Sequence, residues 1–311
     1  MKYYNLNIRK PEIGQTKNVS HCKEWLDRDH PKAPIFYMKH TIDEIISGQS
    51  HPSKKPLSAR GRKEAREFCE IGRDESRRSG TVIVTIDDGC VWIYQPHGVI
   101  QENEVEKYPA DLVKSFPVKI LKKQEVKAVP FILASMKSNQ TFARGTFTEI
   151  TSRAPDYKYI GNILAIEKIL QVEQYSSIPA DFSPLDCLSS LEFETLIAKI
   201  LEANGCFVAS YKGGFLKDMD LIAKNYTEKD ILIDNIVISP GENNSKSFQL
   251  KLVAEAIQKR EADYYISCRG NSQEGWQGRE WVWKQVEQNQ SVKEWLMHAT
   301  EWIPEKIWSW S

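Results

Sequence analysis

The sequence predicts a chain of two domains that both combine α-helices with β-strands. Its 311 residues exceed the roughly 100 to 200 residues of a typical domain, and 41% of them are hydrophobic, which is enough for two cores. Strand-like alternation dominates residues 81–150, whereas helical spacing followed by short strands occurs later in the chain. We therefore predict an N-terminal α+β domain with a small β-barrel-like unit (residues 1–175), a linker (176–188) and a C-terminal α/β domain (189–311).

The charges of the chain balance overall but are unevenly distributed. Lys and Arg number 42, as do Asp and Glu; the first 180 residues hold 28 basic against 22 acidic residues, and the remainder holds 14 against 20. This asymmetry suits a basic front half that meets a polyanion and an acidic rear half that binds metal. Because it is also common in proteins with no nucleic-acid role, charge alone does not decide the function.

Targeting signals and cysteine motifs are missing from the sequence. No run approaches the roughly 18 apolar residues of a membrane span, and the opening MKYYNLNIRKPEIG lacks the apolar segment of a secretory signal. The six cysteines include no CxxC pair, so neither a zinc ribbon nor a disulfide framework is indicated. We expect a cytoplasmic protein with no membrane partner.

The N-terminal half contains a basic stretch followed by strands. Residues 54–78 carry nine basic side chains interrupted by acids, which fits either a surface helix with ion pairs four residues apart or, less commonly, a phosphate-contacting surface. TVIVTI and CVWIYQ flank the turn at residues 87–89 and predict a hairpin, and VKIL and VPFILASM predict further strands. Four aromatic residues either stack on a base or, more commonly, form core: Trp92, Tyr94, Tyr157 and Tyr159.

A helix is predicted at the start of the C-terminal domain. Residues 172–189 hold two prolines and four serines with little periodicity, which is typical of a linker. In the following SSLEFETLIAKILEANG, Ser189 and Glu192 fit a capping box and Gly205 ends the helical spacing. Glu194 lies beside the apolar stripe, so its carboxylate reaches the edge of the surface on which the helix packs. An ordinary glutamate near a helix start is the plainer interpretation.

Short strands follow this helix. CFVASY, the turn Gly213-Gly214 and KDMDLIAKN predict a strand-turn-strand unit, with Asp218 and Asp220 on one face because they lie two residues apart. The strongly apolar DILIDNIVIS, residues 230–239, predicts a central third strand.

The next strand, FQLKLV, alternates between an apolar and a polar face. Alternation places Phe248 and Leu250 on the core face and Gln249 and Lys251 together on the other face. A lysine in a short strand is unremarkable alone, but a lysine and a glutamine on one face, one hairpin away from an aspartate, are a less common combination.

Together these elements resemble the PD-(D/E)xK nuclease superfamily, and most closely its Mrr-like restriction endonuclease branch. The family pattern is a helix with Phe-Glu near its start and Gly near its end, a hairpin entering Asp-Leu-Ile, and a strand with Gln-x-Lys. Within residues 184–270 the pattern is matched by Phe193-Glu194, Gly205, Asp220-Leu221-Ile222 and Gln249-Leu250-Lys251. The resemblance implies a restriction-endonuclease-like mixed sheet flanked by helices.

The resemblance also implies hydrolysis of phosphodiester bonds with Mg²⁺, for which Mn²⁺ could substitute. Asp220 would be the principal metal ligand, the carbonyl oxygen of Gln249 or the backbone carbonyl after it would complete the protein side, and Glu194 would hold a metal-bound water. Lys251 would orient the attacking water and stabilise the developing charge. Gln249 replaces an acid that many superfamily members use, and the glycine-rich approach to Asp220 is only partly kept, so an inactive relative is an open alternative.

The end of the chain is rich in tryptophan. Residues 254–267 predict a helix and a strand that extends the sheet, and seven of the nine tryptophans follow. Five residues fall at helical spacing, which predicts packing against the C-terminal core or another subunit: Val292, Trp295, Leu296, Ala299 and Trp302.

The expected function is therefore a Mg²⁺-dependent endodeoxyribonuclease of the restriction or antiviral-defence type, whose N-terminal half selects the DNA. Two alternatives stay open: a nucleic-acid-binding protein that has lost catalysis, and an interaction protein in which residues 81–170 bind a protein partner. RNA is an alternative substrate. A single active site cuts one strand, so double-strand cleavage would suggest a homodimer.

Overall fold

The computed structural model divides the chain into two compact units. Unit 1 comprises residues 1–151 and 162–176, and unit 2 comprises residues 152–161 and 177–311. The structure describes residues 1–11, 18–37, 39–49, 51–104, 112–129, 146–150, 158–173, 178–180, 182–211, 219–241, 245–251, 262–268, 272 and 275–303. Within these ranges, none of the helices has both the length and the hydropathy needed to cross a bilayer.

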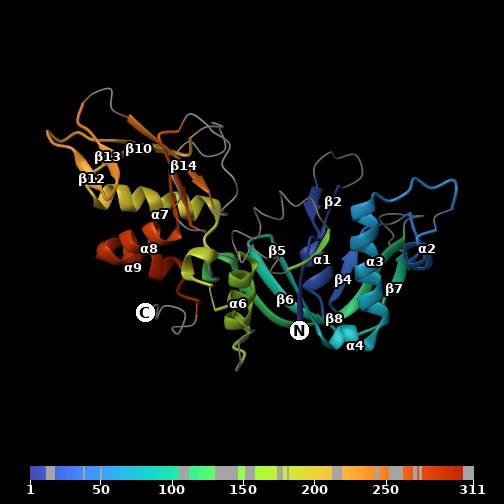
Figure 1. Ribbon diagram of the computed structural model, residues 1–311. Helices are drawn as coiled ribbons and strands as arrows, with labels where there is room; N and C mark the ends of the chain where they lie inside the picture. Colours follow the sequence, from blue (N-terminus) through green and yellow to red (C-terminus); the bar gives the residue numbers. More distant parts are fainter. Residues whose placement is uncertain are drawn as a thin grey trace. The chain divides into compact units, whose positions relative to one another are not determined.

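Unit 1 is built on a curled sheet of mixed direction (Figure 1). The strand order is β4-β8-β6-β5-β1-β9, with β7 paired to β8. The strands are β1 (Lys2–Leu6), β4 (Lys32–Ile35), β5 (Thr81–Asp87), β6 (Cys90–Pro96), β7 (Gln101–Glu104), β8 (Leu112–Glu125) and β9 (Phe147–Glu149). Only β1 and β5 run parallel among these pairs. The alternation that predicted a barrel-like unit thus forms a curled sheet whose end strands do not pair with each other in the described residues.

Helices α1 (Cys22–Leu26), α2 (Ile42–Ser47) and α3 (Ala59–Arg73) contribute buried side chains to the core of unit 1. The chain also forms α4 (Glu75–Ser79), α6 (Lys158–Leu170), the hairpin of β2 (Arg9–Pro11) and β3 (Asn18–Ser20), and the 3-10 turn η1 (Val126–Ala128). Phe68 of α3 stacks on Phe116 of β8, with ring centroids 4.3 Å apart. Trp92 and Tyr94 are buried in the same core, so these two aromatic side chains are structural. The base-stacking alternative for Tyr157 lies outside the described residues, and only the backbone of Tyr159 is described.

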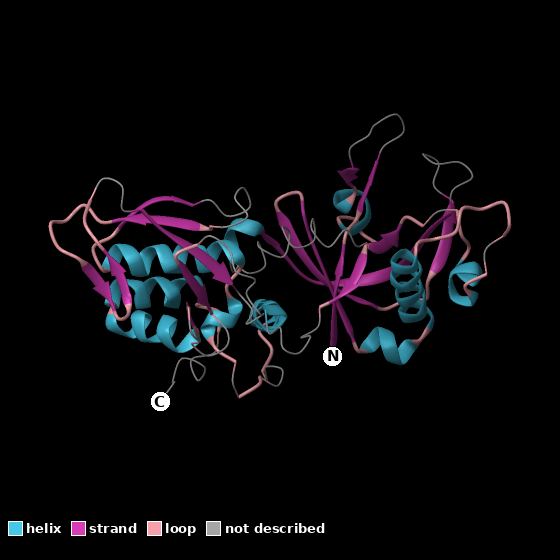
Figure 2. Cartoon of the chain, turned by 45° about the horizontal axis from the view of Figure 1, so that its top comes forward, coloured by secondary structure: helices cyan, strands magenta, loops and turns pink. Residues whose placement is uncertain are grey.

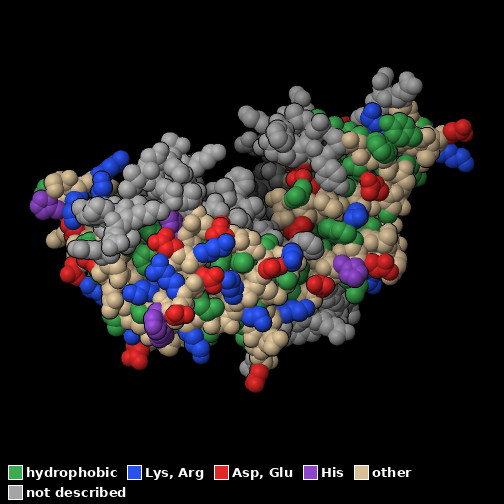
Figure 3. All heavy atoms as spheres, turned by 180° about the vertical axis from the view of Figure 1, so that it is seen from behind, with side chains coloured by type: hydrophobic (Ala, Val, Ile, Leu, Met, Phe, Trp, Pro, Cys, Tyr) green, Lys and Arg blue, Asp and Glu red, His purple; other side chains and the backbone are tan. Residues whose placement is uncertain are grey.

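Much of the basic stretch forms α3 and α4, and many of its arginines are in ion pairs. The pairs are Arg60–Glu64, Arg66–Glu70, Arg73–Asp43, Arg77–Glu67 and Arg77–Glu70. On the face of the molecule in Figure 3, basic and acidic side chains are likewise interspersed. Exposed pairs of this kind contribute only about 0.2–1 kcal/mol each. The ion pairs agree with the surface-helix interpretation of this stretch.

Unit 2 contains a five-stranded mixed sheet in the order β10-β11-β14-β15-β16. The strands are β10 (Phe207–Tyr211), β11 (Leu221–Lys224), β14 (Ser245–Lys251), β15 (Tyr264–Ser267) and β16 (Trp276–Gln277). β10, β11 and β14 pair antiparallel, whereas β14, β15 and β16 pair parallel. The two strands of the predicted strand-turn-strand unit and the predicted Gln-x-Lys strand are confirmed. Within residues 254–267, the predicted helix lies outside the described residues apart from Ala262 and Asp263, and the predicted strand that extends the sheet is confirmed as β15.

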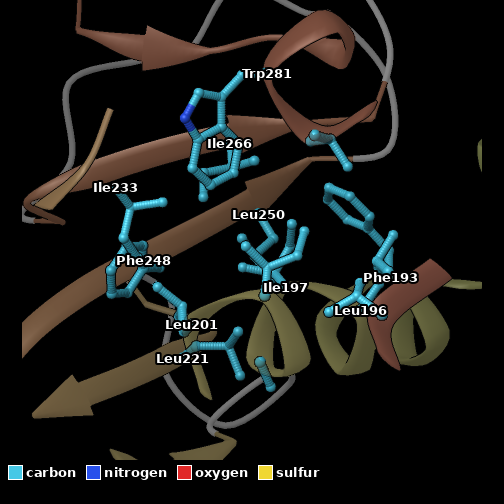
Figure 4. Packing of buried hydrophobic residues seen from close by; sticks show 14 of the residues in the cluster. Phe193, Leu196, Ile197, Leu201, Leu221, Ile233, Phe248, Leu250, Ile266 and Trp281 are labelled. Carbon is cyan, nitrogen blue, oxygen red and sulfur yellow. The ribbon is translucent and has the colours of Figure 1, made fainter. Parts of the chain in front are cut away.

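The helix α7 (Ser190–Ala203) begins at the predicted capping box. The Ser189 N–H donates to the Glu192 carboxylate (2.7 Å), and the Glu192 N–H donates to the Ser189 hydroxyl (3.3 Å). Gly205 follows the helix with a φ of +91°, a conformation that glycine adopts without strain. Figure 4 shows the packing of α7 on the sheet through Phe193, Leu196, Ile197, Leu221, Phe248, Leu250 and Ile266.

The helices α8 (Arg279–Gln288) and α9 (Gln290–Ala299) gather with α7 on one side of the sheet (Figures 1 and 2). Val292 and Leu296 are buried in the core of unit 2, and Trp295 packs against it. The prediction that the tryptophan-rich tail packs on the C-terminal core is confirmed for α9. Trp308 and Trp310 lie outside the described residues.

Residues 230–239 do not form a central strand, and that prediction is wrong. They fold into a separate hairpin of β12 (Ile231–Ile233) and β13 (Ile236–Ile238). Asp234 turns the chain with a φ of +51°, which an aspartate in a turn tolerates. The Asp234 carboxylate is held by the Lys284 ammonium (2.6 Å) and the Gln285 amide (2.9 Å).

Residues 176–188, interpreted from composition as a linker, include the 3-10 helix η2 (Pro184–Cys187). Its residues are buried, and Leu185 and Leu188 belong to the core of unit 2. The Asp186 carboxylate is paired with Arg279, 3.1 Å away, at the start of α8. Residues 184–188 are therefore part of the core of unit 2.

Candidate active site

Asp220 and Gln249 lie opposite each other on neighbouring strands. The register pairs Leu221 with Phe248, and the Asp220 N–H extends the ladder by donating to the Phe248 carbonyl (2.8 Å). Gln249 Nε2 donates to Asp220 Oδ2 at 2.6 Å, and the Leu250 N–H donates to the same oxygen at 2.7 Å. Two donors therefore fix the orientation of the Asp220 carboxylate.

Strand alternation explains why this pair lies away from the core. Leu221 and Ala223 are buried in the core of unit 2, so Asp220 and Ile222 belong to the opposite face of β11. On β14 the same alternation sends Phe248 into the core and Gln249 to the face that carries Asp220. The apolar stripe that folds the sheet thus also sets the position of the polar pair.

The amide of Gln249 is buried and only half satisfied by the described residues. The residue is 5% exposed, and its Nε2 is engaged by Asp220. Its Oε1 has no hydrogen-bond partner in the described part of the chain. A buried acceptor without a hydrogen bond lowers the free energy of unfolding by about 1–3 kcal/mol. This oxygen therefore has an unused capacity to accept a hydrogen bond or to bind a cation.

Glu194 brings a second carboxylate to the site from the first turns of α7. Burial raises the pKa of Glu194, and the negative charge of Asp220 raises this pKa further. A carboxylate that feels a neighbouring carboxylate is destabilised in its charged form, and a cation between the two relieves the repulsion. Asp220 and Gln249 are thus in direct contact, and the pKa of Glu194 responds to the charge of Asp220.

These residues fit a hard divalent cation such as Mg²⁺. Such ions take oxygen ligands and keep several waters, so few protein ligands suffice. Two carboxylates and the unpartnered Gln249 Oε1 supply oxygen donors, whereas no group of three His, Cys, Asp or Glu side chains gathers among the described residues. The donor set is therefore two acids and one amide.

Lys251 is the last residue of β14 and pairs in register with Ser267 of β15. Its position is two residues beyond Gln249, and positions two apart share a face of a strand. The structure describes only the backbone of Lys251. Asp218 and the turn Gly213-Gly214 lie outside the described residues.

Two further residues share this face but were not singled out in the sequence. The parallel β14–β15 register places Tyr265 beside Gln249 and Ser267 beside Lys251. Tyr264 and Ile266, their neighbours in the chain, pack against or within the core of unit 2. The run Tyr-Tyr-Ile-Ser alternates too weakly to reveal this division, and the parallel partner strand cannot be read from local sequence.

Comparison of the chain with protein-family profiles, curated protein sequences and solved structures gave no match.

Proposed function

We propose that unit 2 is a Mg²⁺-dependent endonuclease that hydrolyses phosphodiester bonds in DNA, as restriction and antiviral-defence enzymes do. The proposal rests on one juxtaposition: the Asp220 carboxylate, the nearby Glu194 carboxylate and the unpartnered Gln249 Oε1. Asp220 and Gln249 lie on the sheet face that also holds the position of Lys251. A carboxylate-bound cation beside a lysine is suited to phosphoryl chemistry.

Each side chain has a distinct role in this proposal. A bound Mg²⁺ would neutralise charge on the phosphate and make a water nucleophilic near neutral pH. Asp220 and Gln249 would hold the ion through oxygen atoms, and the Leu250 N–H keeps Asp220 in position. Glu194 would orient a water by accepting its hydrogen bond. Lys251 would donate to a phosphate oxygen and stabilise its growing negative charge.

A DNA-binding role without catalysis is the second candidate. The small number of acidic ligands favours this candidate. Among the described residues, the candidate ligands are two carboxylates and one neutral amide. Lower negative charge weakens the hold on a divalent cation. In both cases unit 1 would select the nucleic acid.

The test is cleavage of plasmid DNA and of single-stranded DNA by the full-length protein in Mg²⁺, Mn²⁺ or EDTA. We expect cleavage with either metal and none in EDTA. Lys251→Ala should lower the cleavage rate by about 100-fold or more, because a positive charge that stabilises the transition state is lost. Lys246→Ala is the matched control, since Lys246 lies on the same strand and pairs with core-facing Ala223.

The form of the cleaved plasmid indicates how many active sites act together. Nicked circles would indicate one active site acting at a time, and linear DNA would indicate a dimer. Equal cleavage by Lys251→Ala and wild type would contradict the assigned site, and binding without cleavage under every condition would favour the second candidate.

A further inference from the structure

The two faces of the sheet in unit 2 differ in chemistry. One face packs on α7 through Leu221, Ala223, Phe248 and Leu250. The opposite face carries Asp220 and Gln249 and continues along β11 to Lys224, four residues beyond Asp220. At about 3.3 Å per residue, the backbone positions of Asp220 and Lys224 are about 13 Å apart.

An exposed aromatic pair lies at the Lys224 end of this face. β10 pairs Phe207 with Lys224, and Val208, the next residue, packs against the core, so Phe207 belongs to the face of Asp220. Phe207 is 53% exposed and Tyr226 is 67% exposed. Their ring centroids are 5.6 Å apart and the rings are tilted by 54°.

This combination of groups fits an unpaired nucleotide strand. Exposed aromatic rings bind bases whose faces are free, and a lysine beside them contacts the phosphate. Paired bases inside a duplex do not present their faces to such rings. The segment from Lys224 to Asp230 carries two basic and two acidic residues, so its net charge is zero and stacking rather than charge would dominate binding.

We propose that Phe207, Tyr226 and Lys224 form a platform for a single-stranded stretch of DNA that leads to the cleaved bond. The substrate class is then DNA with an unpaired strand rather than a plain duplex. The inference relies on the proposed function for the position of the cleaved bond, but the platform itself can be tested by binding alone.

The test measures binding of a fluorescent oligothymidylate to the full-length protein by anisotropy in EDTA, which prevents cleavage. The double variant Phe207→Ala/Tyr226→Ala should bind at least about tenfold more weakly, as expected for lost stacking. The single variant Phe207→Tyr, in which Tyr226 is unchanged, should bind the oligothymidylate as wild type does, because an aromatic ring is kept at residue 207. Leu232→Ala is the matched control, since Leu232 is 66% exposed on the separate β12–β13 hairpin.

Two further readouts sharpen the result. Binding of a blunt duplex should be the same in the double variant and in wild type. Lys224→Ala should lower the slope of log affinity against log salt concentration by about 1, as for one lost phosphate contact.

Unchanged oligothymidylate affinity in the double variant would overturn the platform. A wild-type dimer that becomes a monomer in the double variant, with DNA affinity unchanged, would also overturn it and make the surface a subunit interface. Failure of the proposed function is distinguishable: binding that depends on the rings, in a protein that never cleaves DNA in Mg²⁺, contradicts only the nuclease. Asp220-dependent cleavage with ring-independent binding contradicts only the platform.

Discussion

Replacing Asp220 with Asn is expected to lower metal-dependent DNA cleavage by more than about 100-fold. The amide oxygen of Asn can still accept the Leu250 N–H, so the strand pairing survives. The variant loses the negative charge that attracts the cation, and its amide NH₂ replaces the second carboxylate oxygen, because the oxygen that accepts from Gln249 and Leu250 is kept. The loss should therefore appear in cleavage rate with little change in folding.

Asp263→Asn is the matched control for this substitution. Asp263 Oδ2 accepts the Ser247 N–H at 2.8 Å, so it holds a backbone donor of β14 as Asp220 does, but from an exposed position. Cleavage by Asp263→Asn should equal that of wild type. Equal losses of cleavage in the two variants would mean that both carboxylates act by stabilising β14 and that Asp220 has no separate role in catalysis.

Glu194→Gln is expected to have opposite effects on stability and on activity. The pKa of Glu194 is raised in the folded protein by burial and by Asp220, so its contribution to stability is present at acidic pH and is lost as pH rises through the folded pKa. A neutral glutamine avoids this loss. In metal-free protein the variant should therefore unfold at a higher temperature than wild type near neutral pH, and the difference should shrink toward pH 4 or so.

Addition of Mg²⁺ should reverse the order. A ligand that binds only the folded state raises the unfolding temperature, and wild type should gain more than the variant because Glu194 helps to hold the ion or its water. Cleavage by Glu194→Gln should fall by roughly 10- to 100-fold. Thermal unfolding with and without Mg²⁺ at several pH values measures both effects. A variant less stable than wild type in EDTA at neutral pH would show that Glu194 is a structural residue.

Local signals were sufficient to predict the elements that carry the candidate site. The capping box at Ser189 and the glycine at residue 205 mark both ends of α7, because each satisfies a requirement of the helix terminus itself. Alternation in FQLKLV correctly separates Gln249 from Phe248. The pairing of Asp220 with Gln249 then follows from adjacent antiparallel strands.

Elements whose position depends on distant partners could not be predicted in this way. The apolar run of residues 230–239 has the composition of a central strand, yet the turn at Asp234 folds it back on itself, and Ile231, Ile233, Ile236 and Ile238 share one buried face. Tyr265 joins the site face only because β15 lies parallel to β14. Burial of η2 likewise depends on the core of unit 2, whereas its composition is that of a linker.

Titration of Mn²⁺ into the full-length protein by calorimetry tests most directly whether Asp220, Glu194 and Gln249 form a cation site. The predicted result is a saturable site in wild type and in Asp263→Asn whose affinity falls by at least about tenfold in Asp220→Asn. Identical binding curves for wild type and Asp220→Asn, or no binding by any of the three proteins, would contradict the cation site and with it the proposed nuclease.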